Sequence, residues 1–144
     1  MQRITILALD HAVTSSVMGT MDIFGQVGVT YNFSMGAAPE PLFDVEIVTL
    51  NGEPVSGFNK TQIVPHRSAA EIQGTDLIVI SSFIEIETLS TCKAGIPWLR
   101  RHFEKGATIA ASTGAKGDFS SSPTFTRSGT CSPLPRVLRA TWPC

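Results

Sequence analysis

The stretch "TDLIVISSF", residues 75–83, carries the strongest strand signal in the chain. Its four central residues, 77–80, are all apolar, and no polar residue alternates with them. A strand of this kind is buried on both faces, which is typical of a parallel sheet. The stretch therefore predicts an α/β fold whose sheet is covered by helices on both sides.

The segments on either side of this stretch fit the same fold. Ser15 or Ser16 is expected to cap a helix that runs to about Val27, and Pro97 to open a second helix that Gly106 ends. Strands alternate with helices along the chain, which predicts a parallel sheet with right-handed crossovers. Besides the stretch above, strands are expected at residues 3–9 ("RITILAL"), 43–50 ("FDVEIVTL") and 107–111.

The connecting segments are less regular. Residues 31–41 are interpreted as a loop, residues 55–64 as a short hairpin or two brief strands, and residues 66–74 as one or two helical turns. In the helix after Pro97, the apolar residues expected to face the sheet are Trp98, Leu99 and Phe103.

Composition and charge narrow the function classes. The chain has 144 residues with 42% hydrophobic and 16% charged residues, which suits one globular domain, and its formal net charge is −1. No general attraction to nucleic acid or an anionic membrane is expected from that charge. No apolar run approaches the roughly 20 residues that span a bilayer, and no signal-peptide pattern precedes the first strand, so a cytoplasmic location is expected.

Metal and cofactor chemistry is not indicated. Cys92, Cys131 and Cys144 are widely spaced and suggest neither a disulfide framework nor a zinc site. The sequence holds no glycine-rich phosphate loop, no HExxH and no CxxC motif. Arg100 and Arg101 are interpreted as the solvated face of an amphipathic helix rather than a phosphate site. We expect no metal and no cofactor.

Candidate ligand-binding residues lie where the predicted strands end. Sites in parallel sheets form at the carboxyl ends of the strands. For Asp10 and His11 the alternative is ordinary loop polarity, and for Ser15 and Ser16 the capping role is favoured over binding. The residues expected at a ligand site are Asp10, His11, Ser82, Phe83, Ser112 and Thr113.

Ser112 raises the question of a catalytic nucleophile. It follows the strand at residues 107–111 and precedes Thr113 and Gly114, as a nucleophile at a sharp strand-to-helix turn would. The helix that should follow is missing from the pattern, and only His11 is placed where it could act as a base. A turn serine is therefore the favoured interpretation, and Cys92 shows no feature of a reactive thiol beyond the adjacent Lys93.

The chain changes character after residue 115. Residues 116–144 contain four prolines, five serines and four threonines, with four basic side chains against one acid, and keep neither helical nor strand periodicity. This composition is typical of a disordered or poorly structured tail. We therefore expect a domain at residues 1–115 and an atypical Pro/Ser/Thr-rich tail at 116–144, and we hypothesise that the tail is frameshifted or otherwise aberrant.

Several of these segments together resemble a known family. The segments are "ITILALDHAVTSSVMGTMDIFGQ", "FDVEIVTLNGEPV", "TDLIVISSF" and "PWLRRHFEKGATIAASTGA", which lie in order over residues 3–115. They resemble the ThiJ/PfpI-like (class I glutamine amidotransferase-like) domain found at the N-terminus of AraC-family transcriptional regulators. The resemblance implies a flavodoxin-like three-layer sandwich with a mainly parallel sheet, incomplete here at its C-terminal side.

The resemblance also bears on catalysis. Enzymes of this superfamily carry a cysteine directly before Thr-Gly and an acid from the first helix region. Here Ser112 stands before Thr113, so the segment aligns either with serine in place of the cysteine or with the cysteine deleted after Ser112, and the thiol is absent in both cases. The acid's place, near Ser16, also holds no acid. The resemblance therefore implies a non-catalytic domain that senses a small-molecule effector and dimerises. The alternative is a ThiJ/PfpI-family enzyme, an amidase, glyoxalase or peptidase-like hydrolase.

The resemblance sets expectations for partners as well. In the regulators, DNA is bound only through a C-terminal helix-turn-helix region, and no such region fits in residues 116–144. A sheet that lacks its last covering elements exposes apolar surface or a strand edge, so a homo-oligomer is expected. No membrane partner is expected.

Overall fold

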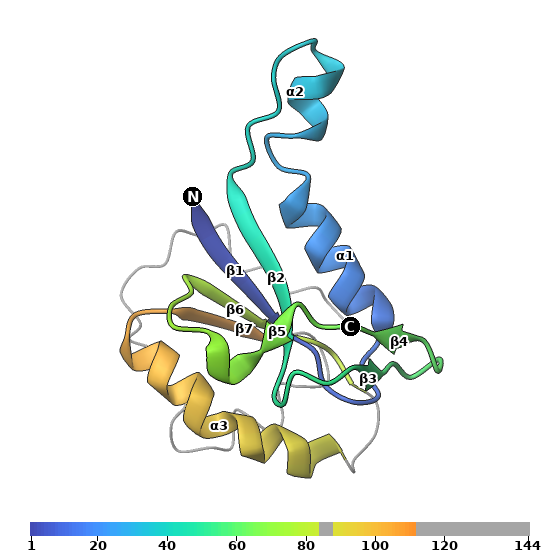
Figure 1. Ribbon diagram of the computed structural model, residues 1–144, viewed down its shortest axis with the longest axis vertical. Helices are drawn as coiled ribbons and strands as arrows, with labels where there is room; N and C mark the ends of the chain where they lie inside the picture. Colours follow the sequence, from blue (N-terminus) through green and yellow to red (C-terminus); the bar gives the residue numbers. More distant parts are fainter. Residues whose placement is uncertain (84–87, 112–144) are drawn as a thin grey trace, which may run out of the picture.

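A computed structural model of the chain describes residues 1–83 and 88–111. At its centre is a five-stranded parallel sheet with the strand order β5-β2-β1-β6-β7 (Figure 1). The central strand pairs with a neighbour on each side: Ile4 lies opposite Val45 of β2 and opposite Leu77 of β6. The strands are β1 (Gln2–Leu7), β2 (Phe43–Thr49), β5 (Arg67–Ser68), β6 (Leu77–Ile80) and β7 (Thr108–Ala111).

Helices cover the two faces of this sheet. Helix α1 (Thr14–Gly25) packs over β1 and β2, and helix α3 (Thr88–Glu104) lies on the opposite face (Figure 1). A short helix, α2 (Thr30–Ser34), follows α1, and β3 (Val55–Ser56) pairs with β4 (Gln62–Ile63) in a separate antiparallel hairpin. This arrangement confirms the predicted α/β, flavodoxin-like fold with a parallel sheet and helices on both sides.

The core is divided between the two faces because neighbouring side chains of a strand point in opposite directions. In β1, Ile6 packs toward α1 with Val17, whereas Leu7 packs toward α3 with Leu99. All four positions from Ile4 to Leu7 are buried. The uninterrupted apolar runs of the central strands are therefore explained by burial on both faces.

Helix α3 begins earlier than the sequence predicts. It begins nine residues before Pro97, which lies inside the helix rather than at its start. Gly95 allows this because the helix lies close to the sheet there: a Cβ on Gly95 would be 3.3 Å from the Leu50 side chain. Tertiary packing thus outweighs the cost of an interior proline. Gly106, with φ +99°, ends the helix as predicted, and Ala107 donates to the His102 carbonyl.

The buried stripe of α3 also differs from the prediction. Trp98 and Leu99 are buried as expected, but Phe103 is 41% exposed. His102, which is 1% exposed, occupies the inward position instead. With 3.6 residues per turn, positions 98, 99 and 102 lie close together on the face toward the sheet, and position 103 falls at the edge of that face. The sequence pattern predicts Phe103 as the inward residue, whereas the inward residue is its neighbour His102.

Three smaller corrections concern helix starts and connections. Among the described residues no side chain caps α1, whose N-cap is Val13, so the expected capping by Ser15 or Ser16 is wrong. The expected loop at residues 31–41 contains α2, and residues 66–74 contain β5 and a single 3-10 turn, Ala69–Glu71. The hairpin predicted at 55–64 is confirmed by β3 and β4. The residues beyond 111, with the proposed change at 115, lie outside the described part of the chain, so the domain boundary stays a prediction.

Because His102 is buried, the free energy of unfolding is expected to depend on pH. Burial lowers the pKa of His102 below its ordinary value of 6.5, and the charges of Arg101 and Lys105 lower it further. Between the folded pKa and 6.5, the unfolded chain binds more protons than the folded one. The free energy of unfolding is therefore expected to fall as the pH drops below about 6.5.

Urea unfolding of the wild type and His102→Asn between about pH 5 and pH 7 measures this effect. The asparagine has no titrating ring, so the loss of stability at acid pH is expected to be smaller in the variant. Equal slopes in the two proteins would show that His102 does not carry the effect.

None of the described helices has the length and apolar character needed to cross a membrane.

Candidate functional site

The candidate site lies at the carboxyl edge of the sheet, between β1 and β6. After β1 the chain passes to β2 on one side, and it later crosses to β6 and β7 on the other. The exits of β1 and β6 therefore lead to opposite sides of the sheet, and such a topological switch point is where open α/β sheets bind ligands. Asp10 and His11 follow β1, and Ser82 and Phe83 follow β6. The fold brings these four predicted residues to one edge.

The turn after β1 is held in an unusual conformation. His11 has a φ of +58°, a left-handed conformation that side-chain-bearing residues seldom adopt. The hairpin fixes it: the His11 amide donates to the Ser56 carbonyl at 2.7 Å, and the Ser56 amide donates to Asp10 Oδ1 at 3.3 Å. Strained backbone of this kind persists only where neighbouring contacts define it, and it is frequent at ligand sites.

A serine links the first helix to the exit of β6. The Ser16 hydroxyl donates to the Val13 carbonyl at 2.7 Å and accepts a hydrogen bond from the Ser82 amide at 3.1 Å. The Val13 amide in turn donates to the Ser82 carbonyl at 2.8 Å. Ser16 is thus neither a helix cap nor an exposed polar residue. It ties the start of α1 to the segment that follows β6.

Ala12 lies at the centre of this junction. It is fully buried and forms isolated bridges with Gly57 of the hairpin segment and with Phe83 after β6. The Phe58 amide donates to the Ala12 carbonyl at 2.9 Å. Phe83 is 7% exposed and packs in the core on the α3 face. Three segments that are far apart in sequence therefore meet at one small residue.

The sequence predicts the hairpin at residues 55–64, but it does not indicate that the hairpin contacts the candidate site. Gly57 allows the close approach, because a Cβ there would lie 2.5 Å from Thr14 Oγ1 and 3.2 Å from the Thr61 carbonyl oxygen. In the sequence, a glycine between Ser56 and Phe58 is a weak indication of this close approach. Ser112 and Thr113 lie outside the described residues; β7 ends at Ala111, which pairs with Ile80. The binding roles of all six candidate residues stay predictions.

The side chains at this edge are polar. Asp10 is exposed, and His11 and Ser82 are partly exposed. They offer a carboxylate, an imidazole and a hydroxyl close to backbone polar groups. Among the described residues, no group of three or more histidine, cysteine, aspartate or glutamate side chains is placed to hold a metal ion.

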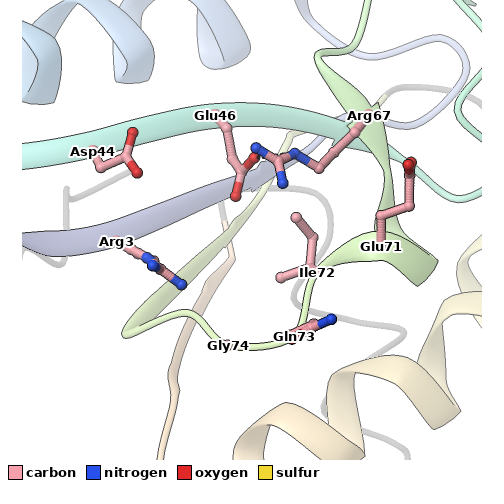
Figure 2. A pocket seen from close by; sticks show the side chains of 8 residues that line it. All are labelled: Arg3, Asp44, Glu46, Arg67, Glu71, Ile72, Gln73 and Gly74. Carbon is pink, nitrogen blue, oxygen red and sulfur yellow. Dashed lines mark ion pairs between the residues drawn. The ribbon is translucent and has the colours of Figure 1, made fainter.

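A separate charged hollow of about 270 Å³ lies near the other end of β1 and β2 (Figure 2). Figure 2 shows the Arg67 guanidinium directed at Glu46, and its Nε lies 2.8 Å from Glu46 Oε2. Glu71 accepts hydrogen bonds from the Ser68 amide and hydroxyl, and these bonds lower the pKa of its carboxyl. Glu46 and Glu71 thus already have partners within the chain, so we interpret these contacts as structural.

Comparisons with known proteins place this fold. No protein-family model and no curated protein matches the sequence. A proposed transcriptional regulator from Vibrio parahaemolyticus superposes with a TM-score of 0.60 at 22% identity, over 76% of this chain and 55% of that one. DJ-1beta from Drosophila melanogaster superposes with a TM-score of 0.64 at 19% identity, over 83% and 59%.

A ThiJ/PfpI family protein from Pseudomonas syringae superposes with a TM-score of 0.56 at 14% identity, over 81% of this chain and 45% of that one. Such identities show a shared fold, and they confirm the fold that the sequence resemblance implies. The chain spans about half of the length of these solved proteins.

Proposed function

From the fold shared with these proteins, we propose that the chain is a non-catalytic, small-molecule-sensing and dimerisation domain of an AraC-family transcriptional regulator. The sequence resemblance over residues 3–115 supports this assignment, and so does the shared fold with the Vibrio regulator. In this proposal DNA is contacted through a separate helix-turn-helix region, and the protein acts in the cytoplasm.

The observation that carries the non-catalytic part is the role of Ser16. The resemblance implies that an acid near this position assists the cysteine in the enzymes. Here a hydroxyl takes its place, and that hydroxyl is engaged with the Val13 carbonyl and the Ser82 amide. A serine that joins two backbone segments supplies no general acid or base. With Ser112 in the place of the thiol, both catalytic requirements are unmet.

The same junction gives the domain a way to sense a ligand. The turn at residues 10–13 is bonded both to the hairpin and to the exit of β6. A molecule held by Asp10, His11 and Ser82 would stabilise the arrangement of all three segments. Binding free energy at the turn is thereby coupled to their relative positions, which is the requirement for a sensor.

An enzyme is the second candidate, because DJ-1beta and the Pseudomonas ThiJ/PfpI family protein share the fold. In that case the chain would be an amidase, glyoxalase or peptidase-like hydrolase, and Ser112 would be its nucleophile. Turnover of methylglyoxal or a peptide substrate that disappears in Ser112→Ala would establish this function and overturn the sensor proposal.

The sensor proposal is tested by thermal unfolding with a panel of amino acids, amines and small carboxylic acids. A ligand at ten times its Kd adds about 1.4 kcal/mol, which raises the melting temperature by about 5–6 °C in a domain of this size. His11→Asn is expected to abolish the shift, because asparagine tolerates the left-handed backbone but lacks the imidazole.

Lys60→Asn is the matched control. Lys60 also has a positive φ, +65°, but lies in the turn between β3 and β4. It is expected to keep the ligand-induced shift. A panel that gives no shift with the wild type, or an equal shift with His11→Asn, would contradict the proposed site.

A further inference from the structure

A projecting arm is the most unusual surface of the molecule. We define the arm as residues 27–42, which contain α2 and the segments that join it to α1 and β2. Figure 1 shows α2 beyond the end of α1 and away from the sheet. All five residues of α2 are described, and none of them is buried. The arm therefore contributes little to the core of its own chain.

Backbone hydrogen bonds nevertheless hold the arm in a defined conformation. At its base the Glu40 amide donates to the Gly28 carbonyl at 2.9 Å, and near its tip the Ala37 amide donates to the Asn32 carbonyl at 2.8 Å. Gly28 has a φ of +78°, and a Cβ there would run into the Glu40 carbonyl oxygen. Glycine is thus required where the two sides of the arm cross. A segment fixed in this way holds its side chains in a defined place.

These side chains are large and apolar. Tyr31, Phe33 and Met35 are 71%, 75% and 67% exposed, and Leu42 is 51% exposed. The only charged residue in the arm is Glu40. Exposed large apolar side chains gathered on one short segment indicate an interaction site.

The helix of the arm is apolar on opposite sides. Tyr31 and Met35 are four residues apart and share one side of α2, whereas Phe33 points to the other. A helix lying on a flat surface would bury only one of these sides. Both are buried only if the arm inserts between two surfaces. The shape required of the partner is therefore a groove rather than a plane.

A groove of about 500 Å³ lies at the foot of the same arm. It is formed between the last turns of α1 and the start of β2, with Pro41 at the base of the arm in its lining. Helix α2 itself projects beyond the end of α1 (Figure 1). The lining of the groove is largely apolar, with Asp22 and Asp44 as its acids. This lining includes Met21, Gly25, Phe43 and Val45.

We propose that two copies of this chain dimerise by exchanging arms, with α2 of each copy seated in the groove of the other. A two-fold axis makes such a contact closed and self-complementary. Each copy would bury the exposed side chains of its arm in the largely apolar lining of the other. The arm's large apolar side chains supply several hundred Å² of contact, and the covered groove adds to it, toward the roughly 800 Å² that each partner contributes to a stable complex.

This inference rests on the dimerisation part of the proposed function and makes it specific. It is independent of the ligand site, because the arm and the groove lie away from the carboxyl edge of the sheet. Ligand-induced thermal shifts therefore test the sensor, and the mass of the particle tests the arm exchange.

Light scattering after size exclusion, with the whole chain at about 50 µM, is expected to give a dimer with a Kd below about 10 µM. Phe33→Asp is expected to weaken association at least about 100-fold, because it places a charge in an apolar groove. The fold should survive, since α2 buries nothing in its own chain. Phe58→Asp is the matched control: Phe58 is 53% exposed on the hairpin, and its variant should stay dimeric.

The groove is tested from the other side with Gly25→Arg. No atom lies within 4 Å of a Cβ built on Gly25, so the fold accepts the side chain while the groove is obstructed. This variant is expected to be monomeric. Gly19→Arg, on the same helix and equally open at its Cβ, is the control and should stay dimeric.

Mixing the two defective proteins distinguishes an exchange of arms from arms that pack on each other. Phe33→Asp has an intact groove and Gly25→Arg an intact arm, so one contact of the two re-forms in a mixed dimer. We expect the mixture to recover partial dimer. A monomeric wild type, as would follow if residues 112–144 covered the arm, overturns the proposal. So does a dimer that survives Phe33→Asp or Gly25→Arg.

Discussion

Leu99→Ala is expected to lower the free energy of unfolding by about 3 kcal/mol. Leu99 is fully buried and packs α3 onto the sheet with Leu7, Val48 and Ile80. Removing its branched end leaves a cavity in a close-packed layer, and surrounding atoms relax only partly into it. In a domain of this size such a loss lowers the melting temperature by about 12 °C or more.

Phe103→Ala provides the contrast on the same helix. The apolar pattern of the sequence placed Phe103 in the buried stripe beside Leu99, but the structure leaves it 41% exposed. Its loss is expected to cost about 1 kcal/mol, well below the cost at Leu99. Urea unfolding of both variants makes the comparison. Equal losses would mean that α3 is rotated relative to the structure described above.

Gly57→Ala is expected to destabilise the protein by about 2 kcal/mol and to abolish the ligand-induced thermal shift. The added Cβ would lie 2.5 Å from Thr14 Oγ1 and 3.3 Å from the Ala12 carbonyl oxygen. To relieve these contacts the hairpin must move away from the turn after β1. That movement breaks the bonds that hold Asp10 and His11 in place.

Gly74→Ala is the control for this substitution. Gly74 also lies in a loop, but nothing stands within 4 Å of its Cβ position. Its variant should be as stable as the wild type or slightly more so. Adding Thr14→Ala to Gly57→Ala should restore part of the loss, because it removes the nearest atom. Full stability of Gly57→Ala alone would show that the hairpin does not fix the site.

The sequence alone was sufficient for four of the five strands of the sheet, and it missed β5. Uninterrupted apolar runs such as residues 77–80 require burial on both faces, and their alternation with helices leaves few topologies. The same reasoning placed Asp10, His11, Ser82 and Phe83 at one edge, because parallel strands end together. These conclusions depend on local pattern and on the direction of the chain, which a sequence contains.

The tertiary structure decided the features that depend on contacts between distant segments. The hydroxyl of Ser16 was interpreted as a helix cap, but it serves Val13 and Ser82, and Ser82 lies 66 residues away in the chain. The hairpin at Gly57 meets Ala12 for the same kind of reason. Pro97 lies inside a helix because the close packing of α3 on the sheet outweighs a local preference.

The arm is a clear example of a feature that only the tertiary structure decides. Its apolar residues alternate with polar ones in sequence, which gave no reason to separate them from an ordinary loop. In the structure they project from the body, and none of α2 is covered by the described residues. A sequence determines which residues prefer to leave water, because that preference is a property of each side chain. Which of them a chain buries within itself, and which it offers to a second copy, follows only from where the folded backbone places them.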